Sequence, residues 1–335
     1  MVRRIIAQNE RIVIGTDVHD VRHNAAVVDR EGQILHETAM PAHRKSWENL
    51  LKRLPDCQVT VVYEAGPHGY NLHDLIKELG HSCKVVAPQK HVGVKTDKRD
   101  ARAIAKDFLA SRAGIVAVPE YAKRVRRQVV RTRESLKKEA RRLKTQINSM
   151  KRFHGLEGGL AAVKKDTTGY IEYMEKVQQE IIAFIQAKIK ELESILKAIA
   201  MEEEYEKQVK ALMSLTGVGF TTAMSVTLGI ADIGKFKKSK QFSSYLGLCP
   251  VENSSGEKRR LGHISKRGPG RLRGLLVQCA WSRVRHDEDE RERYKKLSAR
   301  IGSRRAIVAV ARRLAVSMWW ALKNSGGADP VQLSV

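Results

Sequence analysis

The sequence predicts an α/β amino-terminal domain followed by two mostly α-helical regions. Short β-branched runs alternate with helix-like patterns up to about residue 118, and continuous helical periodicity then extends to about residue 205. The remaining chain combines helical segments with one loop rich in glycine and basic residues. We therefore divide the 335 residues into domains 1–118, 119–205 and 206–335.

The first domain should contain a sheet that begins with hairpins. Its strands are predicted at Ile12–Ile14, Ala25–Val28, Val59–Val62 and Val85–Val86. Short polar turns join the segments IVIGTDVHD, HNAAVVDREG and ILHETAM, so we expect the first three strands to run as consecutive hairpins. The stretch from Asn71 to Gly80 predicts a helix that its glycine ends. Three meandering strands followed by alternating strands and helices is the order of a ribonuclease-H-like sheet.

Two long helices are predicted between residues 119 and 205. The first has thirteen Lys or Arg against three acidic residues between Glu120 and Arg152, so its polar face is a strip of cations. In the second, apolar residues recur at steps of three and four, which predicts one coiled-coil seam. The residues of this seam are Met174, Val177, Ile181, Ile185, Ile189, Leu192, Leu196 and Ile199.

The third region opens with LTGVGFTTA, where Gly217 and Gly219 separate two helical segments. Such a turn is either similar to a helix-hairpin-helix, whose backbone N–H groups approach a phosphate, or an ordinary tight turn between helices; both interpretations stay open. Further on, Ser254–Gly274 combines serines, glycines and basic residues with the single acid Glu257. This composition predicts a flexible cationic loop between packed helices.

Composition indicates a polyanionic partner. With 62 Lys and Arg against 37 Asp and Glu, the formal net charge is +25, which favours nucleic acid. The four cysteines lie far apart without a CxxC pair, so neither a zinc ribbon nor a disulfide framework is indicated. Because the sequence shows no signal-peptide pattern and no run of about 18 apolar residues, we expect a cytoplasmic protein without a membrane span.

Four carboxylates are the candidate metal ligands. Asp17 and Glu64 each end an apolar strand, and Asp97 and Asp100 lie three residues apart at a predicted helix start. If the two strands are neighbours, their carboxylates emerge at one sheet edge. Convergent carboxylates repel one another unless a cation lies between them, and oxygen ligands suit Mg²⁺ or Mn²⁺. Taken singly, each acid also fits a turn, a solvated strand end, a helix cap or a first helical turn.

Ser254 and Ser255 are candidate nucleophiles, although serines beside a glycine usually hydrogen-bond the backbone. Neighbouring basic residues would neutralise an attacked phosphate, but no obvious base stands beside the serines in sequence, although His263 is near. The remaining histidines show no metal-ligand spacing beyond the pair His19 and His23, and they stay unassigned.

Basic residues of the first long helix and of the serine loop are the candidate nucleic-acid ligands. In the helix these are Arg124, Arg126, Arg127, Arg131, Lys137, Lys138, Arg141 and Arg142. In the loop and just after it they are Lys258, Arg259, Arg260, Lys266, Arg267, Arg271 and Arg273.

Six blocks of sequence, in order, resemble the DEDD insertion-sequence transposases of the IS110 family. They are IGTDVHD, VYEAGPHGY, KTDKRDARAIA, LTGVGFTTA, YLGLCP and SSGEKRRLGHISKRGPGRLR, the last being most similar to the IS1111 branch. The resemblance covers almost the whole chain. It implies a RuvC-like domain that holds Mg²⁺ through Asp17, Glu64, Asp97 and Asp100, then a coiled coil and a transposase domain. The catalytic serine would be Ser255, with Ser254 as the alternative.

The resemblance also implies the chemistry and the partners. The serine would attack a DNA phosphodiester and form a phosphoserine linkage, at a site composed of residues from different subunits. A noncoding bridge RNA would pair with donor and target DNA, which agrees with the cationic strip and with the low aromatic content of 5%. A homodimer that assembles into a homotetramer is expected, in a bacterial or archaeal cytoplasm and associated with the nucleoid.

Two other functions remain open from the sequence. A metal-dependent junction nuclease would hydrolyse DNA with water and use the serine loop as a phosphate clamp. A non-enzymatic nucleic-acid-binding protein would use the four acids as caps and turns. Only the first of these two requires a divalent metal.

Overall fold

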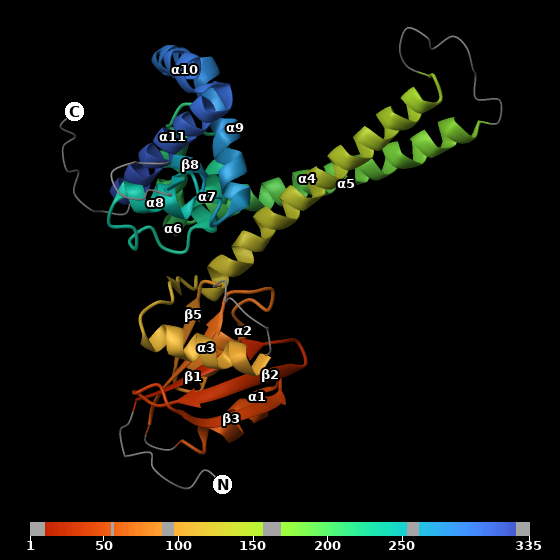
Figure 1. Ribbon diagram of the computed structural model, residues 1–335. Coiled ribbons are helices and arrows are strands. Elements are labelled where there is room, and N and C mark those ends of the chain that lie inside the picture. Colours follow the sequence, from red (N-terminus) through yellow and green to blue (C-terminus); the bar gives the residue numbers. More distant parts are fainter. Residues whose placement is uncertain (1–10, 55–56, 89–96, 157–168, 253–260, 326–335) are drawn as a thin grey trace. The chain divides into compact units, whose positions relative to one another are not determined.

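The computed structural model describes residues 11–54, 57–88, 97–156, 169–252 and 261–325. It divides the chain into two units, Met1–Val118 and Pro119–Val335, each with its own hydrophobic core (Figure 1). The amino-terminal sheet and the helical carboxy-terminal region confirm the mixed fold class. The division into three domains, with a second boundary at residue 205, stays a prediction. Among the helices described, none is long and apolar enough to cross a membrane.

A six-stranded sheet forms the centre of the first unit, in the order β3-β2-β1-β4-β5-β6. Its strands are β1 (Arg11–Val18), β2 (Arg22–Val28), β3 (Ile34–Pro41), β4 (Gln58–Glu64), β5 (Ser82–Val86) and β6 (Ile115–Val116). The antiparallel pairing of β1, β2 and β3 confirms the predicted hairpins. In contrast, β1, β4 and β5 pair in parallel, so their carboxyl ends meet at one edge of the sheet.

Helices cover both faces of this sheet (Figure 1). On one face, α1 (Arg44–Leu51) and α2 (Asn71–Glu78) bury Trp47 and Ile76 against β-branched side chains such as Ile14 and Val61. On the other face, α3 (Asp97–Leu109) packs against Val13 and Val62. Alternate residues of a strand point to opposite faces, which is why continuous apolar runs serve both layers.

The backbone of α3 approaches β1 at Gly15. A Cβ at this position would overlap the carbonyl oxygen of Ala101 and would lie 2.7 Å from the amide nitrogen of Ala105. Ala101 and Ala105 are themselves small and fully buried. Three small residues therefore allow the helix to lie directly on the strand that carries the candidate ligand Asp17.

Two long helices begin the second unit, α4 (Tyr121–Phe153) and α5 (Tyr170–Ala200), and lie side by side (Figure 1). They share a small core of Ala140, Leu143 and Ile147 with Ile182 and Ile185. The ion pair between Lys151 and Glu175, with 2.7 Å between Nζ and Oε1, joins the ends that lie far from the rest of the unit. The connection from α4 to α5 falls outside the residues described.

The seam predicted on α5 is covered within the unit over only part of its length, and the coiled coil stays a prediction. Ile185, Leu196 and Ile199 are buried, but Met174 and Ile181 each expose 44% of their surface. The buried register instead continues through Ile182, because a helix turns by about 100° per residue and Ile181 therefore lies on a neighbouring face. The helix thus carries two apolar stripes, of which only one is covered within the unit.

The rest of the second unit packs around its last helix. The elements are α6 (Glu203–Met213), α7 (Phe220–Gly229), α8 (Ser239–Tyr245), β7 (Pro250–Glu252), β8 (Leu261–Ile264), α9 (Gly270–His286), α10 (Glu288–Ile301) and α11 (Ser303–Ser325). Leu314 and Met318 of α11 are fully buried in the largest core. Between α6 and α7, Gly217 has φ +86° and faces α9, where a Cβ would lie 2.8 Å from the amide of Arg283. That turn is therefore a packing contact between helices, whereas Gly219 has open space beside it.

We expect the substitution Gly15→Ala to destabilise the first unit by about 1–3 kcal/mol, the usual cost of forcing extra volume into a packed core. The added methyl group must displace α3, because its nearest neighbours are backbone atoms. Urea unfolding followed by circular dichroism measures the change. Gly66→Ala is the matched control, since its Cβ would meet no atom closer than 3.9 Å. Equal stability of the two variants would contradict the close approach of α3.

Candidate functional site

Asp17 and Glu64 lie at the carboxyl ends of two adjacent strands. The parallel register of β1 and β4 pairs Thr16 with Tyr63, so the two carboxylate residues come next along their strands. Asp17 exposes 24% of its side chain, and Glu64 is half-buried. The condition set by the sequence, that these strands be neighbours, is met.

Both carboxylates belong to the sheet face that α3 covers. Val13 and Val62 are in the core beneath α3, and side chains an even number of residues further along a strand share their face. By this alternation Asp17 and Glu64 point to the same side. The helix α3 begins at Asp97, as predicted, and Asp100 directly precedes the buried Ala101 that contacts Gly15. The contact at Gly15 therefore brings the start of α3 to the strand that carries Asp17.

The structure describes the side chains of Asp17, Glu64 and Asp100, whereas the side chain of Asp97 lies outside the part of the chain that it describes. Among the side chains that are described, no three His, Cys, Asp or Glu are grouped so that they could hold a metal ion. An unpredicted neighbour is His19, whose Nε2 lies 3.1 Å from Oδ2 of Asp17. Its position two residues after Asp17 was the only sequence signal for this hydrogen bond.

The candidate serines fall between two short strands. β7 and β8 form an antiparallel pair in which Pro250 faces Ile264. Ser254, Ser255, Lys258, Arg259 and Arg260 all lie in residues 253–260, outside the described residues. Past β8, Lys266, Arg267 and Arg271 are exposed.

Arg273 holds the base of this loop. Its Nη1 donates to the carbonyl oxygen of Leu246 at 3.1 Å and to that of Arg267 at 3.3 Å. These bonds tie α9 to the end of α8 and to the segment that follows β8. Of the basic residues predicted here as nucleic-acid ligands, Arg273 thus has a structural contact, whereas Lys266, Arg267 and Arg271 present their charge to solvent.

The cations of α4 form two groups. Near its start, Arg126 pairs with Glu202 at 2.6 Å and Arg127 donates from Nε to the carbonyl oxygen of Leu228 at 2.7 Å. Arg124, also half-buried, lies over the ring of Tyr121. The contacts of Arg126 and Arg127 attach the helix to its own unit, whereas that of Arg124 lies within α4.

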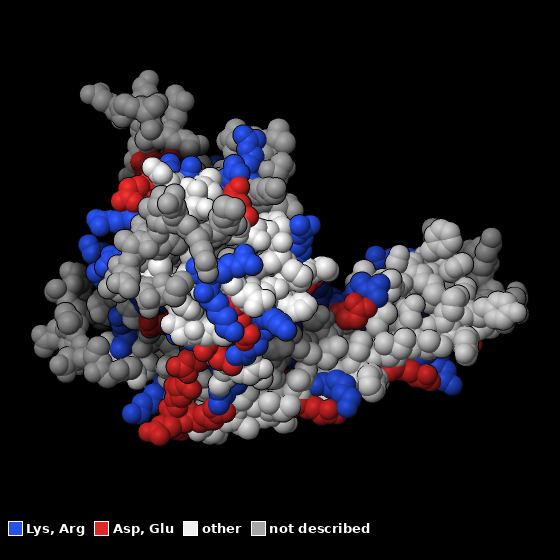
Figure 2. Space-filling model, turned by 90° about the horizontal axis from the view of Figure 1, so that it is seen from below, with Lys and Arg blue, Asp and Glu red and all other residues white. Residues whose placement is uncertain are grey.

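The second group of α4 cations is exposed along the middle of the helix. Its members are Arg131, Lys137, Lys138, Arg141 and Arg142. Arg142 pairs with Glu139, its Nε lying 3.0 Å from Oε1. All five lie away from the face that buries Leu143 and Ile147. Elsewhere cations and acids alternate: on the face shown in Figure 2, Lys and Arg side chains lie next to Asp and Glu.

Family comparisons cover both halves of the chain. The family model of the IS110 DEDD transposases, described as a transposase, matches residues 14–152, the range that contains Asp17, Glu64, Asp97 and Asp100. A second model, described as the transposase IS116/IS110/IS902 family, matches residues 209–295 and so includes Ser254 and Ser255.

Curated relatives of this chain match it over most of their length, and the following three are named as transposases. A putative transposase of Sinorhizobium fredii is 30% identical over 94% of this chain and 90% of its own. The transposase for insertion sequence element IS1111A of Coxiella burnetii is 32% identical over 77% of this chain and 76% of its own. A probable family 20 transposase of Pseudomonas aeruginosa is 29% identical over 91% and 95%. With both family models and full-length relatives in agreement, this chain belongs to the IS110 family of insertion-sequence transposases.

Proposed function

We propose that this transposase cuts and rejoins DNA with a serine nucleophile and a RuvC-like carboxylate site. The observation that carries the proposal is the placement of Asp17 and Glu64 at the ends of adjacent parallel strands, on the face to which α3 brings Asp100. Three antiparallel strands followed by parallel β4 and β5 is the order expected of a ribonuclease-H-like sheet. The two alternative functions considered from the sequence differ on this point. A junction nuclease would use the serine loop only to clamp phosphate, and a non-enzymatic binding protein would use the carboxylates only as caps and turns.

The carboxylate site suits a divalent cation. Transposases of this DEDD family generally depend on divalent metal. Asp17, Glu64, Asp97 and Asp100 offer only oxygen donors, which are the ligands of Mg²⁺ and Mn²⁺. We infer that these four residues hold the ion, which when bound would polarise a phosphodiester and neutralise its developing charge. His19 would orient Asp17 through the hydrogen bond between Nε2 and Oδ2.

The serine would supply the covalent step. Attack of the Ser255 oxygen on the phosphorus of a DNA strand would form a phosphoserine ester and release a hydroxyl group on the other DNA end. Attack of a hydroxyl from a second strand on that ester would restore the serine and join the strands. The exposed cations Lys266, Arg267 and Arg271 follow the serine loop and would bind the phosphates on either side.

The exposed middle of α4 would bind the backbone of a nucleic acid duplex, and we propose a bridge RNA as its ligand. Arg131, Lys137, Lys138 and Arg141 are long, charged side chains without an aromatic residue among them on that face. Such a surface binds phosphates and duplex shape rather than base sequence, which suits a protein whose target is chosen by RNA pairing.

The second apolar stripe of α5 would form the contact between subunits. The stripe consists of Tyr170, Tyr173, Met174, Val177, Ile181, Phe184 and Ile195. At about 100° per residue these side chains fall on one face of the helix, and Phe184 exposes 64% of its surface. A stripe of this kind on a second copy would complete a coiled coil, and a homodimer that pairs into a homotetramer would hold the two DNA molecules for exchange.

Strand exchange tests the nucleophile. We expect Ser255→Ala to abolish both the covalent protein–DNA adduct and the joined product, because the attacking oxygen is removed. Ser254→Ala should retain both. The assay combines donor and target plasmids with the noncoding RNA that flanks the element, and denaturing electrophoresis detects the adduct.

Asp17→Asn in the same assay separates the two sites. It should reduce product by at least about 10²-fold, in the range that charge stabilisation supplies to phosphoryl transfer. If both serine variants still cleave while Asp17→Asn does not, the chain is a metal-dependent nuclease that uses water. If none of the three substitutions changes the products, neither site is catalytic.

The double substitution Lys138→Gln with Arg141→Gln tests the cationic face of α4. It should lower RNA affinity and decrease the slope of log K against log salt by about 2, one for each phosphate contact removed. Filter binding at several salt concentrations gives the slope. Lys188→Gln is the control, because Lys188 on α5 is partly exposed but pairs with Glu191 at 2.9 Å. An unchanged slope in the double variant would place the nucleic acid elsewhere.

The double substitution Val177→Glu with Phe184→Glu tests the subunit contact. Charges on the exposed stripe would have to be desolvated in a coiled coil, so we expect the dimer to dissociate at least about tenfold more readily. Sedimentation equilibrium measures the dissociation constant. Lys190→Glu, an exposed charge change away from the stripe, should leave the dimer intact. A dissociation constant of the double variant equal to that of Lys190→Glu would exclude this stripe as the interface.

A further inference from the structure

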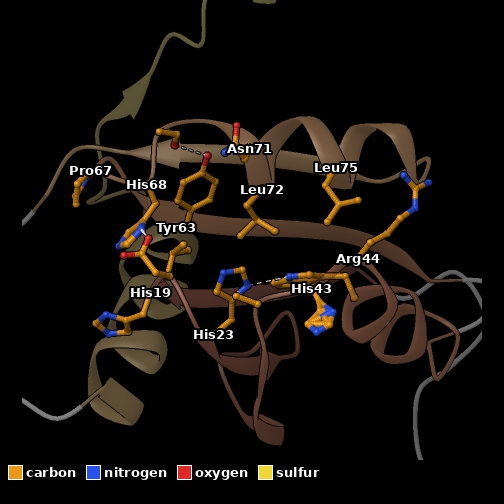
Figure 3. A pocket seen from close by; sticks show the side chains of 15 residues that line it. His19, His23, His43, Arg44, Tyr63, Pro67, His68, Asn71, Leu72 and Leu75 are labelled. Atoms are coloured by element: carbon orange, nitrogen blue, oxygen red, sulfur yellow. Dashed lines mark hydrogen bonds and ion pairs between the residues drawn. The ribbon is translucent and has the colours of Figure 1, made fainter.

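A cavity of about 400 Å³ opens on the sheet face that α1 and α2 cover, opposite to α3 (Figure 3). Its lining combines the apolar and aromatic side chains of Trp47, Tyr63, Leu72 and Leu75 with polar ones. Polar side chains surround the opening: His19, Asp20, His43, Arg44, His68 and Asn71. None of the catalytic steps proposed above uses this space.

His23 places one hydrogen-bond donor in the cavity. The residue is only 8% exposed, and its Nδ1 accepts a hydrogen bond from Nε1 of Trp47 at 3.0 Å. Burial, and then the neighbouring His68 and His19, lower the pKa of His23, so its ring is neutral near pH 7. With Nδ1 acting as the acceptor, the proton of the neutral ring must be on Nε2. No partner for that N–H occurs among the residues described.

The walls of the cavity are held in place by their own contacts. The hydroxyl of Tyr63 donates to the carbonyl oxygen of Gly69 at 3.1 Å, which holds the loop between β4 and α2 in place. At the opening, Nδ1 of His68 lies 2.9 Å from Oδ1 of Asp20, and the rings of His68 and His19 meet edge to face. The cavity is thus formed before any ligand enters.

The cavity adjoins the carboxylate site through β1. Asp17 pairs with Asn24 and the next residue, Val18, pairs with His23, so one step along the strand separates the two sites. They lie on opposite faces of the sheet. His19, which lines the opening of the cavity, also contacts Asp17. A DNA strand bound at Asp17 would therefore have its neighbouring nucleotide at the rim of this cavity.

We propose that the cavity receives one unstacked nucleobase of a DNA strand. A base is flat and apolar on its faces and carries acceptors on its edge, which matches aromatic walls with a single fixed N–H from His23. The imidazoles and Arg44 at the opening suit the adjoining phosphate. A phosphate alone would leave the leucine side chains Leu72 and Leu75 of the lining without a partner. Because the strand is placed by the carboxylate site, the proposal rests on the proposed function.

Photochemical cross-linking tests this assignment directly. Full-length protein is irradiated with a single-stranded oligothymidylate that carries one 5-iododeoxyuridine, with Ca²⁺ in place of Mg²⁺ so that the carboxylate site can still hold the strand, and the cross-linked peptide is identified by mass spectrometry. We expect it to contain Trp47 or Tyr63. His23→Asn keeps an oxygen that accepts from Trp47, but its shorter side chain has no donor at the position of Nε2, so cross-linking should fall by roughly fivefold to tenfold, as for one lost hydrogen bond.

Two further variants keep the test decisive. Ala42→Phe, at the opening, should block the cavity, whereas the same change at the exposed Ala110, beyond α3, should leave cross-linking unchanged. His23→Asn and Ala42→Phe lie outside the carboxylate and serine sites, so each should lower cross-linking whether or not Asp17→Asn abolishes strand cleavage, and failure of the catalytic proposal is distinguishable. Cross-links outside the cavity, or full cross-linking in both His23→Asn and Ala42→Phe, would overturn the assignment. Displacement by thymidine monophosphate as effective as by the oligonucleotide would make it a site for free nucleotides instead.

Discussion

The contact between Gly15 and the backbone of α3 is the constraint on which the candidate carboxylate site depends. One strand residue without a side chain, facing Ala101 and Ala105, lets α3 lie directly on β1. This contact brings the helix start with Asp97 and Asp100 to the strand that ends at Asp17. Because the neighbours are backbone atoms and small side chains in a dense core, they leave no room for adjustment. A packing requirement in the interior thus controls the spacing of charged groups at the surface.

The sequence predicted the parts of the first unit that depend on local pattern. The β-branched runs and polar turns gave the three hairpin strands, and strand ends identified Asp17 and Glu64 as candidates for one edge. Periodicity was less informative on α5, because Ile181 and Ile182 are adjacent in sequence, yet one is exposed and the other faces α4. The sequence did not predict contacts between distant segments. Arg127 donates to the carbonyl oxygen of Leu228, and the histidine-lined cavity brings together residues from the ends of β1 and β4 and from the beginnings of α1 and α2.

Positive charge serves two purposes in this protein. Some cations are part of the framework: Arg133 is 5% exposed and its Nε donates to Glu193 at 2.9 Å, which links α4 to α5. Others, such as Lys137 and Arg141, remain exposed on the same helix. A charge inside a protein needs a partner, whereas an exposed one is free to meet phosphate. Some of the 62 Lys and Arg side chains are therefore not available to nucleic acid, although all of them contribute to the net charge of +25.

The paired helices α4 and α5, with 33 and 31 residues, make an arm whose reach is easily altered. At 1.5 Å per residue the arm is about 45–50 Å long, and its own contacts repeat along its length. Loss or gain of seven residues in both helices would change that reach by about 10 Å while keeping every remaining apolar residue on its side of the pair. The length of this helix pair can therefore change without altering the core of either unit.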